Sequence, residues 1–290
     1  MSALFDASYL RPISMDQVVK LQYGASAHAL AKTDHLHGWV ARVGTEEKSI
    51  NLATAYPSTG MLTLVAKGVR SGDWAAANLK GLSHVVFPVM VIAKDFAGDL
   101  GSVNRGLDYF RSNLAYVRKF YLGRVGRTFK LLQPVVAISS KSASDLNRLC
   151  DITTNDAHRN DFFYGLQSEY TSGLIACRAD LLVVCAPFTG SSSSHWNGAA
   201  GLPGFAAVPP DTTSLQCPES GPVDAATKRA TYGMAHEMGH AFDLDHTTIA
   251  FPLDPKRRES VMETKHPPEA ILVPGEVTKL KASPFFTDMA

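Results

Sequence analysis

The segment 235–246 constrains this chain more than any other, because it places three histidines at a spacing that suits one local structure. It reads AHEMGHAFDLDH and carries His236, His240 and His246. Residues four apart lie on one face of a helix, so the imidazoles of His236 and His240 can reach a single metal ion. The spacing therefore predicts a helix through residue 240 with half of a metal site on one face.

The residue types of this segment point to zinc. A catalytic zinc ion takes three protein ligands and keeps one position open for water, and imidazole nitrogens are among its preferred ligands. We expect one Zn²⁺ ion, with His236 and His240 as two ligands and His246 as the best placed third. Glu237 follows the first ligand, where its carboxylate can act as a general base.

The segment resembles the zinc-binding helix of the metzincin metallopeptidases, whose pattern is HExxHxxGxxH followed by a methionine turn. It looks closest to the matrixins, in which alanine commonly precedes HExGHA and Leu-Asp-His closes the motif, as residues 244–246 do here. The resemblance implies the three histidines as ligands and Glu237 as the base of a zinc-dependent endopeptidase that cleaves proteins or peptides. It also implies that Met262 is the turn methionine beneath the metal.

Asp243 departs from this pattern, because it occupies the position of the family's glycine. That glycine leaves the helix in a left-handed conformation, which aspartate adopts at a cost of roughly 1–2 kcal/mol. We therefore predict a positive φ at Asp243. In the alternatives, Asp243 or Asp245 replaces His246 as third ligand, or a distant glutamate does so as in the gluzincins. The candidate glutamates are Glu259, Glu263, Glu269 and Glu276, although no NExxSD-like helix accompanies them.

Apolar runs and helical periodicity alternate through the rest of the chain. Residues 85–92, 131–138 and 181–186 are typical of buried strands, and residues 107–121 and 162–170 have helical spacing, the first ended by Gly123 and Gly126. This order predicts an α/β fold with a mixed, mainly parallel sheet and packed helices. It also resembles the upper part of the metzincin fold, with the zinc helix above a methionine turn.

The sequence divides into two regions. We expect a metzincin-like catalytic domain over residues 81–290 and a small β-rich subdomain or extension over residues 1–80, with strands near 37–43 and 61–66. An inhibitory propeptide is one role for this region, but no cysteine precedes Cys150, so it has no thiolate latch of the matrixin kind. Its histidines, His28, His35 and His37, fit scattered surface residues better than a second metal site.

Residues 198–208 are small, apolar and rich in glycine. The corresponding metzincin segment is an edge strand that pairs with the substrate, so the resemblance implies that a protein or peptide binds along the sheet edge near Gly198 to Val208. Only His195 and Asp211 are available nearby as further ligands, so we expect no additional structural ion. A zinc-dependent hydrolase of a non-peptide amide and an inactive zinc-binding interaction module are the alternatives, and the retained Glu237 favours an enzyme.

Charge and cysteine content add weaker indications. The chain carries 28 basic and 27 acidic residues, so its charge provides no case for a nucleic-acid or membrane partner. No apolar run reaches the length of a membrane span. The sequence shows no Asn-x-Ser/Thr site and no signal-like segment, which slightly favours the cytoplasm without excluding secretion. The four cysteines allow either two disulfides or buried thiols. They are Cys150, Cys177, Cys185 and Cys217.

Overall fold

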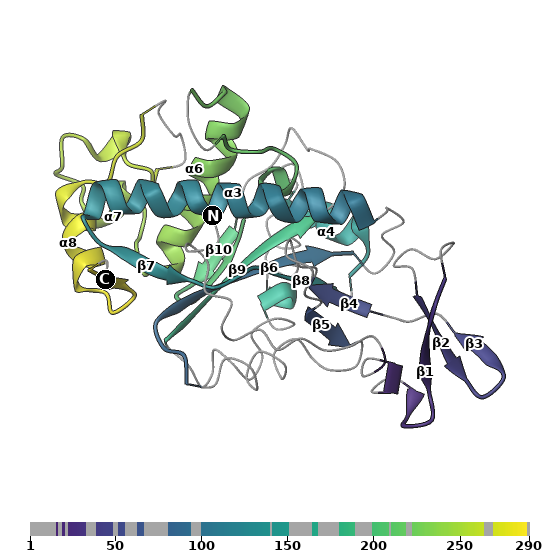
Figure 1. Ribbon diagram of the computed structural model, residues 1–290. Helices are drawn as coiled ribbons and strands as arrows, with labels where there is room; N and C mark the ends of the chain where they lie inside the picture. The colour runs from purple at the N-terminus through teal and green to yellow at the C-terminus, as the bar shows by residue number, and fades with distance from the viewer. Residues whose placement is uncertain are drawn as a thin grey trace.

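The computed structural model describes residues 16, 19–20, 23–32, 39–48, 52–55, 63–66, 81–93, 100–139, 141–150, 164–167, 180–188, 199–208, 210–218, 222–263 and 269–288. Within these ranges the chain is a mixed α/β protein (Figure 1). It contains a seven-stranded sheet, a three-stranded sheet and a two-stranded sheet. The predicted fold class is confirmed at this level.

Two long parallel strands form the centre of the seven-stranded sheet. Strand β6 (Val85–Ile92) pairs with β9 (Leu181–Phe188) along its whole length, from Val85 opposite Leu181 to Ile92 opposite Phe188. Every residue of both strands is buried. Parallel strands covered on both faces are continuous apolar runs, which is why these two were visible in the sequence. The second strand extends two residues beyond the predicted end at Ala186.

The predicted strand over residues 131–138 is wrong, because the chain forms two strands there. Strand β7 (Thr128–Leu131) pairs with the start of β6, and β8 (Val135–Ile138) pairs with its end, both in parallel. Pro134 lies between them and has no N–H to donate to a ladder, so the chain leaves the sheet and re-enters it. Strand β12 (Phe286–Thr287) completes this side and runs antiparallel to β7.

The other side of the sheet ends in a hairpin. Strand β11 (Phe205–Ala207) runs parallel to β9, and β10 (Ala199–Leu202) runs antiparallel to β11. The expected single edge strand over 198–208 is therefore two strands joined at Gly204, whose φ of 92° suits glycine. Strand β10 stands last in the strand order, so an edge does lie within the predicted segment.

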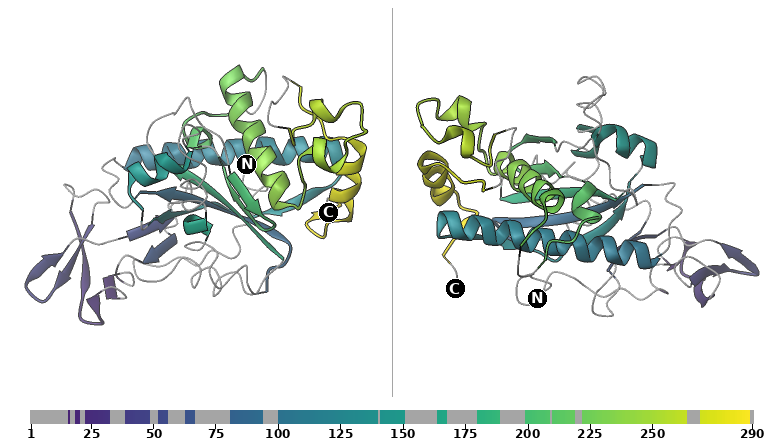
Figure 2. Two further views of the ribbon diagram at one scale, coloured as in Figure 1. Left: turned by 180° about the vertical axis from the view of Figure 1, so that it is seen from behind. Right: turned by 90° about the horizontal axis from the view of Figure 1, so that it is seen from above.

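Two helices cover the sheet and contact each other. Helix α3 (Leu100–Val125) is longer at both ends than the predicted 107–121, runs through Gly123, and stops before Gly126 at φ 76°. It packs against α6 (Ala225–Ala241) and the sheet (Figures 1 and 2). The apolar residues of α3 that lie three or four apart are all buried: Leu107, Phe110, Leu114, Val117 and Tyr121.

Shorter elements follow along the chain. They are helix α4 (Ala143–Cys150), the 3-10 turns η2 (Pro210–Thr213) and η3 (Arg257–Glu259), and helices α7 (Thr247–Ala250) and α8 (Pro274–Ala282). Residues 164–167 are helical, whereas the rest of the helix predicted over 162–170 lies outside the described residues. In the described part of the chain, no helix is both long and apolar enough to span a membrane.

The N-terminal region is rich in strands, as predicted. Strands β1 (His28–Ala31), β2 (Trp39–Val43) and β3 (Glu46–Lys48) form an antiparallel sheet that stands apart from the main sheet (Figures 1 and 2). Strands β4 (Leu52–Ala55) and β5 (Thr63–Ala66) form a hairpin, and β4 lies beside β8. The division at residue 80 stays a prediction.

Several predicted features fall on positions that the structure does not describe. Cys185 and Cys217 are buried thiols that form no disulfide. Of the histidines, cysteines and glycines named in the sequence analysis, five lie outside the described ranges: His35, His37, Cys177, His195 and Gly198.

Candidate metal centre

Helix α6 is the scaffold of the site. Its N-cap is Asp224, whose carboxylate accepts hydrogen bonds from the backbone N–H groups of Ala226 and Thr227 at 2.9 and 3.0 Å. Such a cap satisfies amides that the first turn leaves without partners. The helix then runs to Ala241, and its second half is almost wholly buried. The predicted histidine-bearing helix is therefore present, and it is largely buried.

The structure brings the three predicted histidines together. Their ring centroids lie 4.6 Å (His236 to His240), 4.8 Å (His240 to His246) and 5.3 Å (His236 to His246) apart. One nitrogen of each ring lies within 4.8 Å of one nitrogen of the other two. His236 and His240 project from α6, whereas His246 is the N-cap of α7. Among the described residues, no other group of three histidine, cysteine or acidic side chains has this arrangement.

Hydrogen bonds to backbone carbonyls orient two of the rings. The Nδ1 atom of His236 lies 2.8 Å from the carbonyl oxygen of Val261, and that of His240 lies 2.7 Å from the carbonyl oxygen of Leu244. A carbonyl only accepts, so each Nδ1 carries the proton and each Nε2 presents a lone pair. Metal-binding histidines are commonly fixed in this way.

The two Nε2 atoms face each other at 3.1 Å. Two lone pairs at this distance repel unless a cation lies between them. Nitrogens bound tetrahedrally at about 2.0–2.1 Å from zinc would stand roughly 3.3 Å apart, close to the observed separation. The separation of the His236 and His240 nitrogens suits a zinc ion, and the three imidazoles together could hold a metal ion.

Burial favours the neutral form of His240. The pKa of His240 lies below its ordinary value, chiefly because burial disfavours the imidazolium and also because His246 is close. The carbonyl of Leu244 and the carboxylate of Asp245 act in the opposite direction. Since a metal binds only the neutral imidazole, the net lowering favours metal binding at neutral pH.

Glu237 and His236 are neighbours inside the buried helix. The exposed fraction of Glu237 is 6% and that of His236 is 7%. Glu237 directly follows His236 on this buried helix, and both residues are shielded from solvent.

Met262 lies against the backbone of the same helix at Gly239. It is completely buried. A Cβ built on Gly239 would overlap its sulfur and would come within 3.0 Å of its Cε and 3.2 Å of the Tyr121 hydroxyl oxygen. Because residue 239 is glycine, the Met262 thioether can pack against the backbone of α6 at a position between His236 and His240. The Tyr121 hydroxyl also donates to the carbonyl of Ala235 at 2.7 Å.

Asp243 has the left-handed backbone that the sequence predicted, with φ at 70°. Its exposed carboxylate pairs with Lys279 at 3.2 Å and does not join the histidine group. Asp245 is also exposed. Neither aspartate therefore belongs to the group that could hold a metal ion, whereas His246 does.

The four glutamates considered as distant ligands likewise stand outside the histidine group. Glu259 and Glu269 are exposed, and Glu263 accepts a hydrogen bond from the Thr248 N–H at 2.6 Å. Glu276 is completely buried, and burial raises its pKa above the usual range although its hydrogen bonds act in the opposite direction. The sequence named Glu276 only as a candidate distant ligand and did not point to Lys279, because no spacing rule links α8 to the histidines.

Comparison with known proteins gives few matches. No protein-family model matches this chain, and no curated protein is significantly similar to it in sequence. Among solved structures it is similar to catalytically inactive OgpA from Akkermansia muciniphila, in complex with an O-glycopeptide substrate named glycodrosocin. The TM-score is 0.45 and the sequence identity is 13% over 72% of this chain. The chain spans 62% of the length of that protein.

Proposed function

We propose that this protein is a zinc-dependent peptidase of the metzincin type. The convergence of three imidazole nitrogens next to the buried Glu237, with two of the rings already oriented by carbonyls, is the observation that carries the proposal. A zinc ion held by His236, His240 and His246 would supply a Lewis acid that polarises the scissile carbonyl and lowers the pKa of water.

Glu237 is the proton carrier in this proposal. Its carboxylate accepts a proton from the attacking water and then delivers it to the nitrogen of the leaving amine as the C–N bond breaks. Its fixed place on α6 removes the need to orient it during the reaction. The carbonyls of Val261 and Leu244 keep the rings of His236 and His240 in one tautomer throughout, and Met262 provides an apolar floor.

The neighbouring sheet edge supports a peptide substrate. Strand β10 ends the strand order and packs beside α6, and the backbone N–H of Gly204 donates to the carbonyl of Ala241 at 2.9 Å. The hairpin is thus attached to the end of the histidine helix. An extended peptide added to β10 by main-chain hydrogen bonds would run past this helix. This favours peptides over small non-peptide amides.

The test combines metal content with turnover of the full chain. The unsubstituted protein should contain one zinc ion by elemental analysis and should cleave members of a fluorogenic peptide library, with activity lost on chelation. His236→Ala should lose the zinc. Glu237→Gln should keep it and lose about a hundredfold or more in rate, because an amide cannot accept the proton.

Glu269→Gln is the matched control, because that carboxylate is 83% exposed and should change neither property. Zinc-free native protein would contradict the metal site, and equal turnover by Glu237→Gln at equal zinc content would remove Glu237 from the mechanism. Cleavage of simple amides without any cleavage of peptides would instead support the non-peptide alternative.

A further inference from the structure

The loop that carries His246 is held at a strained residue. Asp243 follows the C-cap of α6 with φ at 70°, a backbone conformation that residues with side chains rarely adopt. His246 lies three residues later, and its position depends on the direction in which the chain leaves this turn. A strained turn keeps one direction only if other contacts hold it.

Lys279 of helix α8 supplies such contacts. Its ammonium group donates to the carbonyl oxygen of Asp243 and lies 3.2 Å from the carboxylate oxygen Oδ2 of the same residue. One cation therefore holds both the backbone and the side chain of the left-handed residue. Glycine at this position would offer only the carbonyl, so the second contact requires the aspartate.

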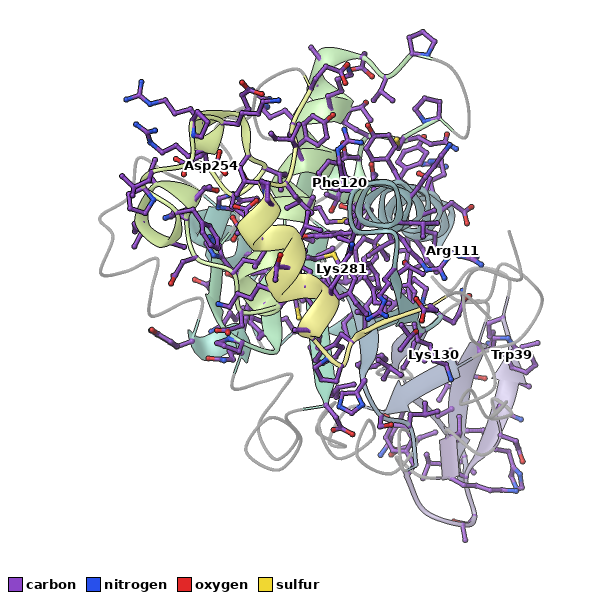
Figure 3. All side chains as sticks on the ribbon, turned by 90° about the vertical axis from the view of Figure 1, so that its left-hand side faces the viewer. Trp39, Arg111, Phe120, Lys130, Asp254 and Lys281 are labelled. Atoms are coloured by element: carbon purple, nitrogen blue, oxygen red, sulfur yellow. The ribbon has the colours of Figure 1, made fainter. Side chains whose placement is uncertain are left out.

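The same helix holds the other side of the loop. The buried carboxylate of Glu276 accepts hydrogen bonds from the hydroxyl of Thr247 and, at 2.9 Å, from the hydroxyl of Ser260. Thr247 directly follows His246 in the chain. Helix α8 therefore contacts the chain on both sides of His246, through Lys279 before it and through Glu276 after it. Figure 3 shows α8 turned toward the viewer, where its exposed Lys281 is labelled.

We propose that Lys279 is a positioning residue for the third metal ligand, and that the Asp243–Lys279 pair replaces the glycine of the usual motif. This inference rests on the proposed function, because it takes His246 as a ligand of zinc. Lys279 touches neither metal nor substrate. It acts by holding the turn at Asp243 in the conformation that returns His246 to the other two histidines.

The test is a zinc dissociation constant measured by competition with a chromophoric chelator on the full chain. Lys279→Met should weaken zinc binding about three- to tenfold. Removing a buried contact to a metal ligand would weaken binding more, but the Asp243–Lys279 pair is partly exposed to solvent. Lys279→Arg keeps a charged donor and should retain most of the affinity. Lys281→Met is the matched control on the same helix and should bind zinc as the parent does.

The same substitution in an Asp243→Gly variant separates a positioning role of Lys279 from a general effect on stability. In Asp243→Gly the turn needs no such holding, because glycine adopts positive φ without strain. Adding Lys279→Met to that variant should change zinc affinity by less than about twofold. The urea midpoint of the metal-free protein should be the same for Lys279→Met and Lys281→Met, so a structural effect alone would not account for the loss.

Several results would overturn the inference, and they can be told apart. Unchanged affinity in Lys279→Met, or an equal loss in both backgrounds, overturns the positioning role alone, provided that His246→Ala does weaken zinc binding. If His246→Ala leaves zinc binding unchanged, the third ligand is wrong and the inference fails with it. If the unsubstituted chain binds no zinc, the proposed function fails as well.

Discussion

Replacing Gly239 with alanine tests the packing beneath the histidine helix. Helix propensity alone predicts that alanine for glycine in a helix interior stabilises a protein by about 0.5–1 kcal/mol. The structure predicts otherwise at this position, because the new Cβ would overlap the buried Met262 sulfur and would lie 3.2 Å from the Tyr121 hydroxyl oxygen. Overpacking of this kind costs about 1–3 kcal/mol.

Gly123→Ala is the matched control for this substitution. Gly123 also lies within a helix, α3, and a Cβ built there meets nothing within 4 Å. Gly123→Ala should therefore gain the stability that helix propensity predicts. Gly239→Ala should fall below Gly123→Ala by about 1–3 kcal/mol in free energy of unfolding, or roughly 2–12 °C in Tm.

The assay is urea unfolding of the metal-free proteins, so that zinc binding does not contribute to the stabilities. The double variant Gly239→Ala with Met262→Ala, compared with Met262→Ala alone, shows whether the thioether causes the cost. Once the sulfur is removed, alanine at 239 should be neutral or stabilising. Equal shifts for Gly239→Ala and Gly123→Ala, or a cost that persists without Met262, would refute the packing argument.

Three further predictions concern hydrogen bonds and titration. Tyr121→Phe should lower the free energy of unfolding by about 0.5–1.5 kcal/mol, measured by urea unfolding, because the carbonyl of Ala235 loses a buried donor. Burial raises the pKa of Glu276 above its ordinary 4.5, so this group lowers stability as pH rises from about 4.5 through its folded pKa; Tm measured across that range should fall less in Glu276→Gln. The Thr227 hydroxyl and the backbone N–H groups of the first turn lower the pKa of Asp224, so this cap stabilises the fold above about pH 3.8 and its contribution is lost as pH falls further. Asp224→Ala should lower the urea midpoint at pH 7 and have little effect at pH 2.5.

The features that the sequence predicted correctly depend on short-range geometry. The pairing of His236 with His240 follows from the helical period, and the apolar run of β6 follows from burial on both faces. The positive φ at Asp243 was predicted from the glycine of the family pattern. In each case the information lies within a few residues of the feature itself.

The wrong predictions concern the residues at which strands and helices begin and end. There, contacts with a neighbouring element override the local preference of the sequence. Residues 131–138 and 198–208 were each predicted as one strand, but each segment forms two strands, which Pro134 and Gly204 separate. Gly123 was expected to end a helix, yet α3 continues through it to Val125. Propensity describes a single residue, whereas these boundaries depend on what the neighbouring element offers.

The sequence by itself determined that His236, Glu237 and His240 share one helix, because that relation depends only on the helical repeat. Tertiary structure alone decided how His246 returns to them and what holds it there. Lys279 lies 36 residues from Asp243, and Glu276 lies 29 residues from Thr247. Contacts at such separations arise only when α8 folds back beside the chain that follows the histidine helix, so no local pattern encodes them.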